Sequence, residues 1–403
     1  MPHPTPPTPP AAPAAPGRPR DRRGVALLTA LLGVVIVTAM IVGGFFASTQ
    51  EFRAARNQLV EQRAFAVAEY GLNYEISDWD RGRNLNPPAP GAMAIGSSVV
   101  KRRYVAGDDT AFVTISRLTP TTFWVVSEGK SQMGSGALES RRRTSAYVRL
   151  AYPDMDVQAA VTAAGDIDVT GASRITGVDT PPPGWSTCAG YPATELHAVR
   201  VPPGATVSHK VNSFPGTKDI RYDAAAADSN TYVRYGTETW NSLVANADIR
   251  LSGGVMGSDI MPTSSGGSCT PGDTNWGEQR RTPQGGETIV PECYNHFPII
   301  YSDGDLQLNG KGRGQGILLV NGDLRINGKF NFFGIVIARD DIEKGTGTAS
   351  IHGAVFSRDA NVGDDSFWAG TQDVYYSRCA IENALRGSAI LTRVAERHWT
   401  QLH

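Results

Sequence analysis

The feature that most constrains the fold is an uncharged apolar run close to the N-terminus. It extends from Val25 to Ala47 and contains no Asp, Glu, Lys or Arg. As an α-helix, a run of this length spans roughly 35 Å, which is enough to cross the hydrocarbon core of a bilayer. It is longer than a secretory h-region and lacks an A-x-A exit, so it predicts an anchor that remains in the membrane.

The residues before this run predict its orientation. Residues 1–23 form a Pro-rich leader that ends in four closely spaced arginines and should be disordered. The positive-inside rule places these arginines in the cytoplasm and everything after about residue 50 on the other side of the membrane. The leader and the apolar run therefore predict a single-pass membrane protein with an external C-terminal part.

The helix is expected to continue beyond the membrane. From Gln50 to about Asp78 the sequence contains no proline, and its apolar residues fall along adjacent stripes at helical spacing. Pro87 and Pro88 end the helical pattern. We therefore expect one long helix over residues 24–80, transmembrane in its first half and amphipathic in its second.

An antiparallel β meander is expected over residues 90–152. Residues 110–117, 121–128 and 143–151 are rich in Val, Thr, Phe, Tyr and Ile, with partial alternation and turn signals between them. The high glycine and proline counts, 44 and 26, also suit turn-rich β structure better than a helical bundle.

A repeat governs the C-terminal half. Gly304-Asp305-Leu306, Gly322-Asp323-Leu324 and Asp340-Asp341-Ile342 follow short apolar strands at intervals of 18 residues. Short strands separated by Gly, Asp and Asn turns at this period predict a parallel β-solenoid over residues 153–385, because each coil buries its apolar face against its neighbours. Ordinary hairpins with coincidental turns are the alternative. Each Asp is expected to cap its own turn.

Two segments depart from the repeat. Residues 181–297 lose the apolar pattern and are interpreted as a long loop-rich insertion, and residues 386–403 are expected to form a capping helix. The predicted fold class is therefore α+β and mainly β: a long N-terminal helix, a small antiparallel meander and a C-terminal parallel β-solenoid of about 18 residues per coil.

The four cysteines predict two disulfides. Cys188, Cys269, Cys293 and Cys379 include no C-x-x-C pair and no histidine at a ligand spacing, so no metal site is expected. An even number in a chain that crosses a membrane favours disulfides in an oxidising compartment. Cys269 and Cys293 are the more probable local pair, which leaves Cys188 with Cys379. Sequence alone allows all three connectivities.

Charge and motifs argue against nucleic-acid binding and catalysis. The 38 basic and 39 acidic residues nearly cancel, whereas a nucleic-acid partner would require a concentrated basic face. The Gly-rich stretch 310–316 lacks the Lys-Ser/Thr ending of a phosphate-binding loop, and the seven histidines are scattered. No cofactor is expected. A β-helical polysaccharide lyase or hydrolase is the best enzymatic alternative, since aspartates lie near the strand ends.

The N-terminal region resembles PilX-type minor pilins of type IV pili. The resemblance covers roughly residues 20–80 and rests on a basic leader, a glycine, an apolar helix and a polar stretch. The matching residues are Arg23-Gly24-Val25-Ala26-Leu27-Leu28, Arg56-Asn57-Gln58, Ala64-Phe65, Ala68-Glu69 and Gly71-Leu72. Residues 275–278, 297–300 and 314–320 are similar to C-terminal halves found on such proteins.

The resemblance implies processing and assembly. Prepilin peptidase would cleave after Gly24, leave Val25 as the new N-terminus, and release a subunit whose long helix packs into a filament. The other partners implied are pilins or pseudopilins, the inner-membrane assembly platform and membrane lipid. The chain would sit in the inner membrane with a periplasmic C-terminal domain and then reach the pilus or cell surface.

Thr29 departs from the major-pilin pattern. Major pilins carry Glu as the fifth mature residue, where it neutralises the N-terminal amine of a neighbouring subunit. The type II secretion pseudopilin K, whose N-terminus is also similar to this one, lacks that Glu and sits at the filament tip. The resemblance therefore implies a tip or priming role and no enzymatic activity. A membrane-tethered β-helix that binds or cleaves surface polysaccharide is the alternative.

Overall fold

The computed structural model describes residues 23–402 apart from several short gaps. The gaps are residues 86–90, 135–137, 152–154, 170, 186–193, 237, 281–287, 344–346, 358–365, 369–370 and 394–398. The chain divides into two units: the first extends to Arg63 and includes residues 132–140, and the second comprises residues 64–131 and 141–403. The described part is mainly β, with one long N-terminal helix.

Helix α1 (Arg23–Ser77) is 55 residues long and agrees with the helix expected over residues 24–80. The 3₁₀ turn η1 (Arg81–Asn84) follows it, and its first turn is capped by Asp80, whose side chain accepts a hydrogen bond from the backbone N–H of Gly82. Within the second unit, Ala64, Ala68 and Leu72 of α1 are buried. The C-terminal part of α1 is therefore a core element of this unit.

The antiparallel sheet has the strand order β1-β2-β3-β4-β26, with β27 also paired with β4. Its first four strands are β1 (Ser98–Ala106), β2 (Asp109–Arg117), β3 (Thr122–Met133) and β4 (Leu138–Ala151). Its core contains Val113, Ile115, Phe123, Val125 and Val148. The meander expected over residues 90–152 is thus present, and it gains two strands from the far end of the chain.

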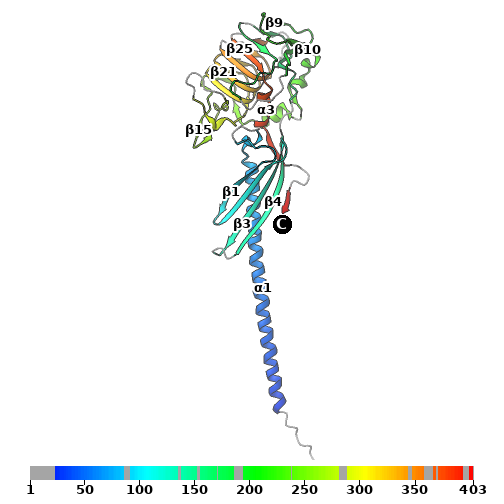
Figure 1. Ribbon diagram of the computed structural model, residues 1–403, viewed down its shortest axis with the longest axis vertical. Helices are drawn as coiled ribbons and strands as arrows, with labels where there is room; N and C mark the ends of the chain where they lie inside the picture. Colours follow the sequence, from blue (N-terminus) through cyan, green and yellow to red (C-terminus); the bar gives the residue numbers. More distant parts are fainter. Residues whose placement is uncertain are drawn as a thin grey trace, which may run out of the picture. The chain divides into compact units, whose positions relative to one another are not determined.

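The C-terminal residues differ from the expected capping helix over residues 386–403. The helix there is α3 (Arg378–Gly387), followed by β26 (Ile390–Arg393) and β27 (Trp399–Leu402), which pair antiparallel with β4. In Figure 1 these red strands lie beside β4. Ser377 caps the start of the helix, and its side chain accepts a hydrogen bond from the Ala380 N–H. It ends at Gly387, where a Cβ would lie only 2.5 Å from the Phe297 ring.

A second group of strands is paired in parallel and forms the parallel region of the molecule, residues 159–376. Its ten-stranded sheet runs β10-β8-β5-β23-β21-β19-β17-β13, with β25 paired to β23 and β7 paired to β25. The main strands are β5 (Ala159–Ala163), β8 (His197–Val201), β10 (Ile220–Tyr222), β13 (Ile249–Leu251), β17 (Ile299–Ser302), β19 (Gly312–Val320), β21 (Lys329–Ala338), β23 (Thr348–Ser357), β25 (Thr371–Tyr376) and β7 (Ile175–Thr176).

A four-stranded parallel sheet follows the 18-residue repeat. Its order is β14 (Gly254–Met256), β18 (Leu306–Leu308), β20 (Leu324–Ile326) and β22 (Ile342–Glu343). Leu306 is aligned with Leu324, and Leu324 with Ile342. All three side chains are buried, as expected for one stacked column.

Residues 181–297 do not form an insertion that leaves the sheets. They contribute β8 and β10 at one end of the ten-stranded sheet, β13 at the other end, and β14 at the edge of the four-stranded sheet. These strands are only three to five residues long, and charged side chains interrupt them, as in Ile249-Arg250-Leu251. The apolar pattern was therefore too short to reveal them.

A column of glycines sets the register of the longest parallel strands. Gly316, Gly334 and Gly353 are aligned on β19, β21 and β23, each with a positive φ of 111° to 148°. A Cβ at Gly334 would lie 2.0 Å from the Gly316 carbonyl oxygen and 3.0 Å from Ala384 of α3. Helix α3 packs against β19, β21 and β23 (Figure 1). Only glycine permits this backbone conformation and this close approach.

The remaining elements are short. A parallel three-stranded sheet is formed by β6 (Ile167–Val169), β9 (Val207–His209) and β24 (Ser366–Trp368). Two antiparallel pairs are formed by β11 (Arg234–Tyr235) with β12 (Glu238–Thr239) and by β15 (Ser264–Ser265) with β16 (Ser268–Cys269). The short helices are η3 (Ala224–Ala227), η4 (Ser229–Tyr232), α2 (Trp240–Ala245) and η5 (Pro291–Cys293).

Candidate functional site

The N-terminal half of α1 exposes its apolar side chains on all sides. Leu27, Met40 and Phe45 are about 70% exposed, and the large apolar residues between them are exposed as well. In the described part of the chain, α1 is the one helix long and apolar enough to cross a membrane. A soluble protein would bury such a surface, so this half of α1 is a candidate membrane anchor.

The predicted processing residues lie at the start of this helix. Gly24 and Val25 are in the first turn of α1, and the Val25 side chain lies outside the described part of the structure. Thr29 is one turn further along, and its hydroxyl donates to the carbonyl oxygen of Ala26 at 3.1 Å. This position therefore carries a neutral hydroxyl bonded to the helix backbone and no carboxylate.

The motif at residues 68–72 joins α1 to the antiparallel sheet within the second unit. A Cβ at Gly71 would lie 2.5 Å from Ala111 Cβ and 2.8 Å from Ser127 Oγ, and a Cβ at Gly129 would overlap the backbone of Ala64 and Ala68. Helix and sheet thus pack backbone to backbone at these glycines. The Ala-Glu-x-Gly-Leu pattern is explained by packing.

A buried carboxylate lies at the end of the helix. Glu75 is fully buried and accepts hydrogen bonds from Arg83 at 3.2 Å and from Arg103 at 3.0 Å. Arg83, in η1, is also buried, and Arg103 is in β1. The cluster ties the helix end, the following turn and the edge strand together. Sequence analysis missed it, because the three residues share no local spacing.

Arg117 fixes the segment between η1 and β1. Its fully buried guanidinium donates to the carbonyl oxygens of Leu85 at 2.7 Å and Met93 at 2.6 Å, and also to those of Asn84 and Pro120. Burial, with Arg386 nearby, lowers the pKa of Arg117. The one sequence signal was a charged residue at the end of an otherwise apolar, alternating strand.

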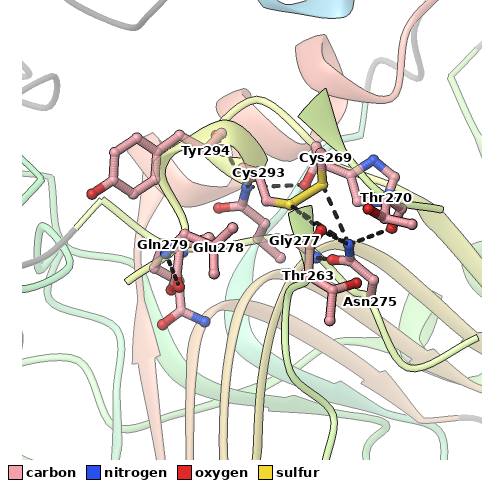
Figure 2. Close-up of a disulfide and its surroundings, with 12 residues drawn as sticks. Thr263, Cys269, Thr270, Asn275, Gly277, Glu278, Gln279, Cys293 and Tyr294 are labelled. Carbon is pink, nitrogen blue, oxygen red and sulfur yellow. Dashed lines mark hydrogen bonds between the residues drawn. A yellow bond between two sulfur atoms is a disulfide. The ribbon is translucent and has the colours of Figure 1, made fainter. Parts of the chain in front are cut away.

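The disulfide between Cys269 and Cys293 closes a loop of the parallel region, as Figure 2 shows. Beside it, the Asn275 amide donates to the carbonyl oxygens of Thr263 at 3.1 Å and Thr270 at 2.6 Å. This is the pair expected to be local. Cys379 is also disulfide-bonded, and the partner expected for it, Cys188, lies outside the described residues.

An ion pair holds the same loop against β19. Glu278 is fully buried and accepts from Arg313 Nε at 2.7 Å and Nη2 at 2.6 Å. The Gln315 N–H donates to the Trp276 carbonyl oxygen at 2.8 Å, and the buried Trp276 ring packs on Phe330 and Phe332. The Asn275–Glu278 segment singled out in the sequence therefore docks the loop on the sheet.

The repeat aspartates bond to the next repeat of the sequence and not to their own turn. Asp305 Oδ1 accepts from the Asp323 N–H at 2.9 Å, and Asp323 Oδ1 accepts from the Asp341 N–H at 2.9 Å. Asn327 Nδ2 donates to Asn309 Oδ1 at 2.9 Å, a bond over the same interval between two side chains. The expectation of a local cap at Asp305 and Asp323 was wrong, because these carboxylates accept from backbone donors 18 residues further along the chain.

Comparisons with known proteins give limited information. No family model matches the chain, and no curated protein matches it. Among solved structures, it is similar to the competence-associated pilin ComZ from Thermus thermophilus, with 16% sequence identity, 86% of this chain and 97% of that chain covered, and a TM-score of 0.24. A TM-score this low does not establish a common fold, so the function is argued from the chain itself.

Proposed function

We propose that this chain is a minor pilin or pseudopilin, a structural and assembly subunit of a type IV pilus-like filament. The observation that carries the proposal is the two-part character of α1. One continuous helix is uncharged from Val25 to Ala47 and exposed from Ala26 to Ala47, and from Ala64 onward it is built into the core of a β domain. Such a helix suits a subunit that is stored in a membrane and later packed beside identical or similar helices.

The proposal includes a defined life cycle. Prepilin peptidase cleaves between Gly24 and Val25 at the cytoplasmic face of the inner membrane. The single-pass subunit, with its C-terminal domain in the periplasm, then joins other pilins through the assembly platform and reaches the cell surface. Because Thr29 has no carboxylate to neutralise the amine of a preceding subunit, a tip or priming position is favoured.

We further propose that the parallel region is a β-solenoid of about 18 residues per coil that the filament displays. The in-register columns at Leu306, Leu324 and Ile342 support this reading. The chain is proposed to act without catalysis, since the Asp305 and Asp323 carboxylates are engaged in backbone hydrogen bonds between coils. The PilX-type resemblance of residues 20–80 supports the same assignment.

Mass spectrometry of the mature N-terminus tests the proposal. When the whole chain is expressed, the protein recovered from membranes should begin at Val25. The variant Gly24→Phe should keep its leader, because a bulky side chain blocks the approach of the peptidase. Gly33→Phe is the matched control: that position has no neighbouring atom within 4 Å, so cleavage should continue. Wild-type protein that begins at Met1 would contradict the processing step.

Filament shearing separates this function from the alternative of a membrane-tethered β-helix acting on surface polysaccharide. A pilus subunit should appear in the sheared surface fraction together with other pilins. A tethered binder or enzyme should remain with the membrane when the filaments are removed, and its loss should leave filament assembly intact.

A further inference from the structure

A cavity of about 590 Å³ opens in the parallel region, away from every feature used above. It is formed where β8, β11 and β23 meet the segment preceding β5, and it is lined by Met155, Asp156, Arg200, Thr231, Arg234, Tyr235, Gly236 and Phe356. This volume is in the range of small-molecule sites. The lining includes two guanidinium groups, one carboxylate and two hydroxyls, of which that of Thr231 donates to the Ala225 carbonyl oxygen at 2.6 Å and can still accept. The cavity therefore has the means to orient a polar ligand.

Arg200 supplies the strongest indication of a ligand. The residue is only 8% exposed, and its Nε donates to Asp223 Oδ2 at 3.0 Å. Neither of its Nη groups has a hydrogen-bond partner among the described residues. A guanidinium that is mostly buried, with donors left over, is stabilised by an acceptor entering the cavity that it lines.

The charges around the cavity favour an anion. Asp223 is shared, since Arg221 also approaches its Oδ2 at 3.1 Å, and the Ala225 N–H and Arg200 lower the pKa of Asp223. Arg234 is exposed and has no ion-pair or hydrogen-bond partner among the residues described. Three guanidinium groups against the carboxylates of Asp156 and Asp223 leave one net positive charge.

The remaining groups specify what kind of anion. Asp156 and Thr231 can bond hydroxyl groups, and Asp156 would repel a dianion such as phosphate. Tyr235 and Phe356 are only 3% and 4% exposed and contact each other edge to face, so they offer little surface to an apolar side chain. The Tyr235 hydroxyl is already bonded to the Tyr232 carbonyl oxygen.

We propose that this cavity binds a hexuronate residue of an acidic saccharide. The sugar carboxylate bonds to the Nη groups of Arg200 and to Arg234, and sugar hydroxyls donate to Asp156 or bond to Thr231. The displayed region of the proposed filament subunit would then carry a receptor site for an acidic surface polysaccharide. Binding at this site needs no filament, so the binding proposal can be tested independently of the proposed assembly function.

The proposal is tested by measuring how tightly the full chain in detergent binds glucuronate, with calorimetry or ligand-observed NMR. Wild-type protein should bind glucuronate and discriminate against glucose, which lacks the carboxylate. Arg234→Gln should weaken glucuronate binding about tenfold or more, because it removes a charge-assisted hydrogen bond. Since Arg234 has no partner in the described part of the chain, this variant should fold normally. Arg200→Gln should weaken binding at least as much.

Arg149→Gln is the matched control, an exposed arginine of β4 outside the cavity, and it should bind glucuronate as wild type does. Three results would overturn the assignment: no detectable glucuronate binding, equal binding of glucose, or an unchanged affinity in Arg234→Gln. Tighter binding of inorganic phosphate than of glucuronate would also overturn it, since it would make the site one for a dianion.

Discussion

The antiparallel sheet and the parallel region are specified in different ways. In the antiparallel sheet, single residues far apart in sequence meet once, as Glu75, Arg83 and Arg103 do at the end of α1. In the parallel region, the same contact recurs from one 18-residue repeat to the next, as between Asp305, Asp323 and Asp341. A repeated contact can be read from the sequence because it has a period, whereas a contact made once has none.

The two regions should also differ in how a substitution lowers their stability. A change at a repeated position affects the paired strands on both sides. A change in the charge cluster of the antiparallel sheet leaves one buried partner without an opposite charge. The following predictions concern the free energy of unfolding of the full chain in detergent, and they run from the largest expected effect to the smallest.

Leu324→Asp should unfold the parallel region. Leu324 is fully buried and paired on both sides, with Leu306 and Ile342, so the variant buries an unpaired carboxylate. The expected loss exceeds about 4 kcal/mol. Arg325→Gln, at the adjacent exposed position of β20, should change stability by less than about 0.5 kcal/mol. Far-UV circular dichroism during urea titration measures both, and a folded Leu324→Asp protein would refute the stacked column.

Glu75→Gln should destabilise the antiparallel sheet by about 3–5 kcal/mol, because it leaves the buried Arg83 without its negative partner. Glu128→Gln provides the comparison within the same sheet. Glu128 pairs with Arg141 and Arg143, whose side chains are more than half exposed, so its loss should cost about 1 kcal/mol or less. Equal losses in the two variants would mean that the buried cluster does not hold the helix end.

Acidification should weaken the parallel region through His352. This ring is stacked between Phe333 and Tyr375, and burial lowers its pKa from 6.5 to about 4. Between pH 6.5 and 4, the unfolded chain takes up a proton that the folded chain does not, so stability falls as the pH decreases. The expected loss is about 3 kcal/mol. His352→Phe should remove this component from unfolding curves measured at pH 7 and pH 4, leaving the contribution of other groups.

The smallest effects are expected at the aspartate column. Asp323→Asn keeps an acceptor for the Asp341 N–H and reduces repulsion from Asp305, so stability should change by less than about 0.5 kcal/mol. Asp323→Ala removes the acceptor and should cost about 1 kcal/mol. Thermal unfolding of the pair separates the two expectations. A polysaccharide lyase that used this carboxylate would instead lose its activity in Asp323→Asn without loss of stability.

The sequence was informative where its pattern was long or repeated. The apolar run and the stripes after it defined α1, and the interval of 18 residues aligned Leu306, Leu324 and Ile342. The same reasoning failed for β8, β10, β13 and β14, because a strand of three to five residues is too short to display a period. It also missed that the residues after Gly387 return to β4, since strand pairing over this distance leaves no local signal.

The candidate sites were predictable to a smaller extent. The roles expected for Gly24, Val25 and Thr29 came from the resemblance of the N-terminal region to pilins and stay predictions, whereas the Cys269–Cys293 bond was expected from its short separation. Sequence analysis did not identify Arg200 and Arg234 of the cavity, because no local motif marks either arginine. Only the fold brings them together with Asp156. Their grouping depends on contacts between strands that are distant in the chain.

The pairing of β26 and β27 with β4 has a consequence for the order in which the chain folds during synthesis. The chain leaves the antiparallel sheet at Ala151 and returns to it only at Ile390, so β4 acquires its second neighbour after the whole intervening segment has been synthesised. Until then the edge of β4 remains open. A chain whose synthesis stops before Ile390 would present that edge to any extended segment nearby, and completion of the sheet thus reports that β26 and β27 have been made.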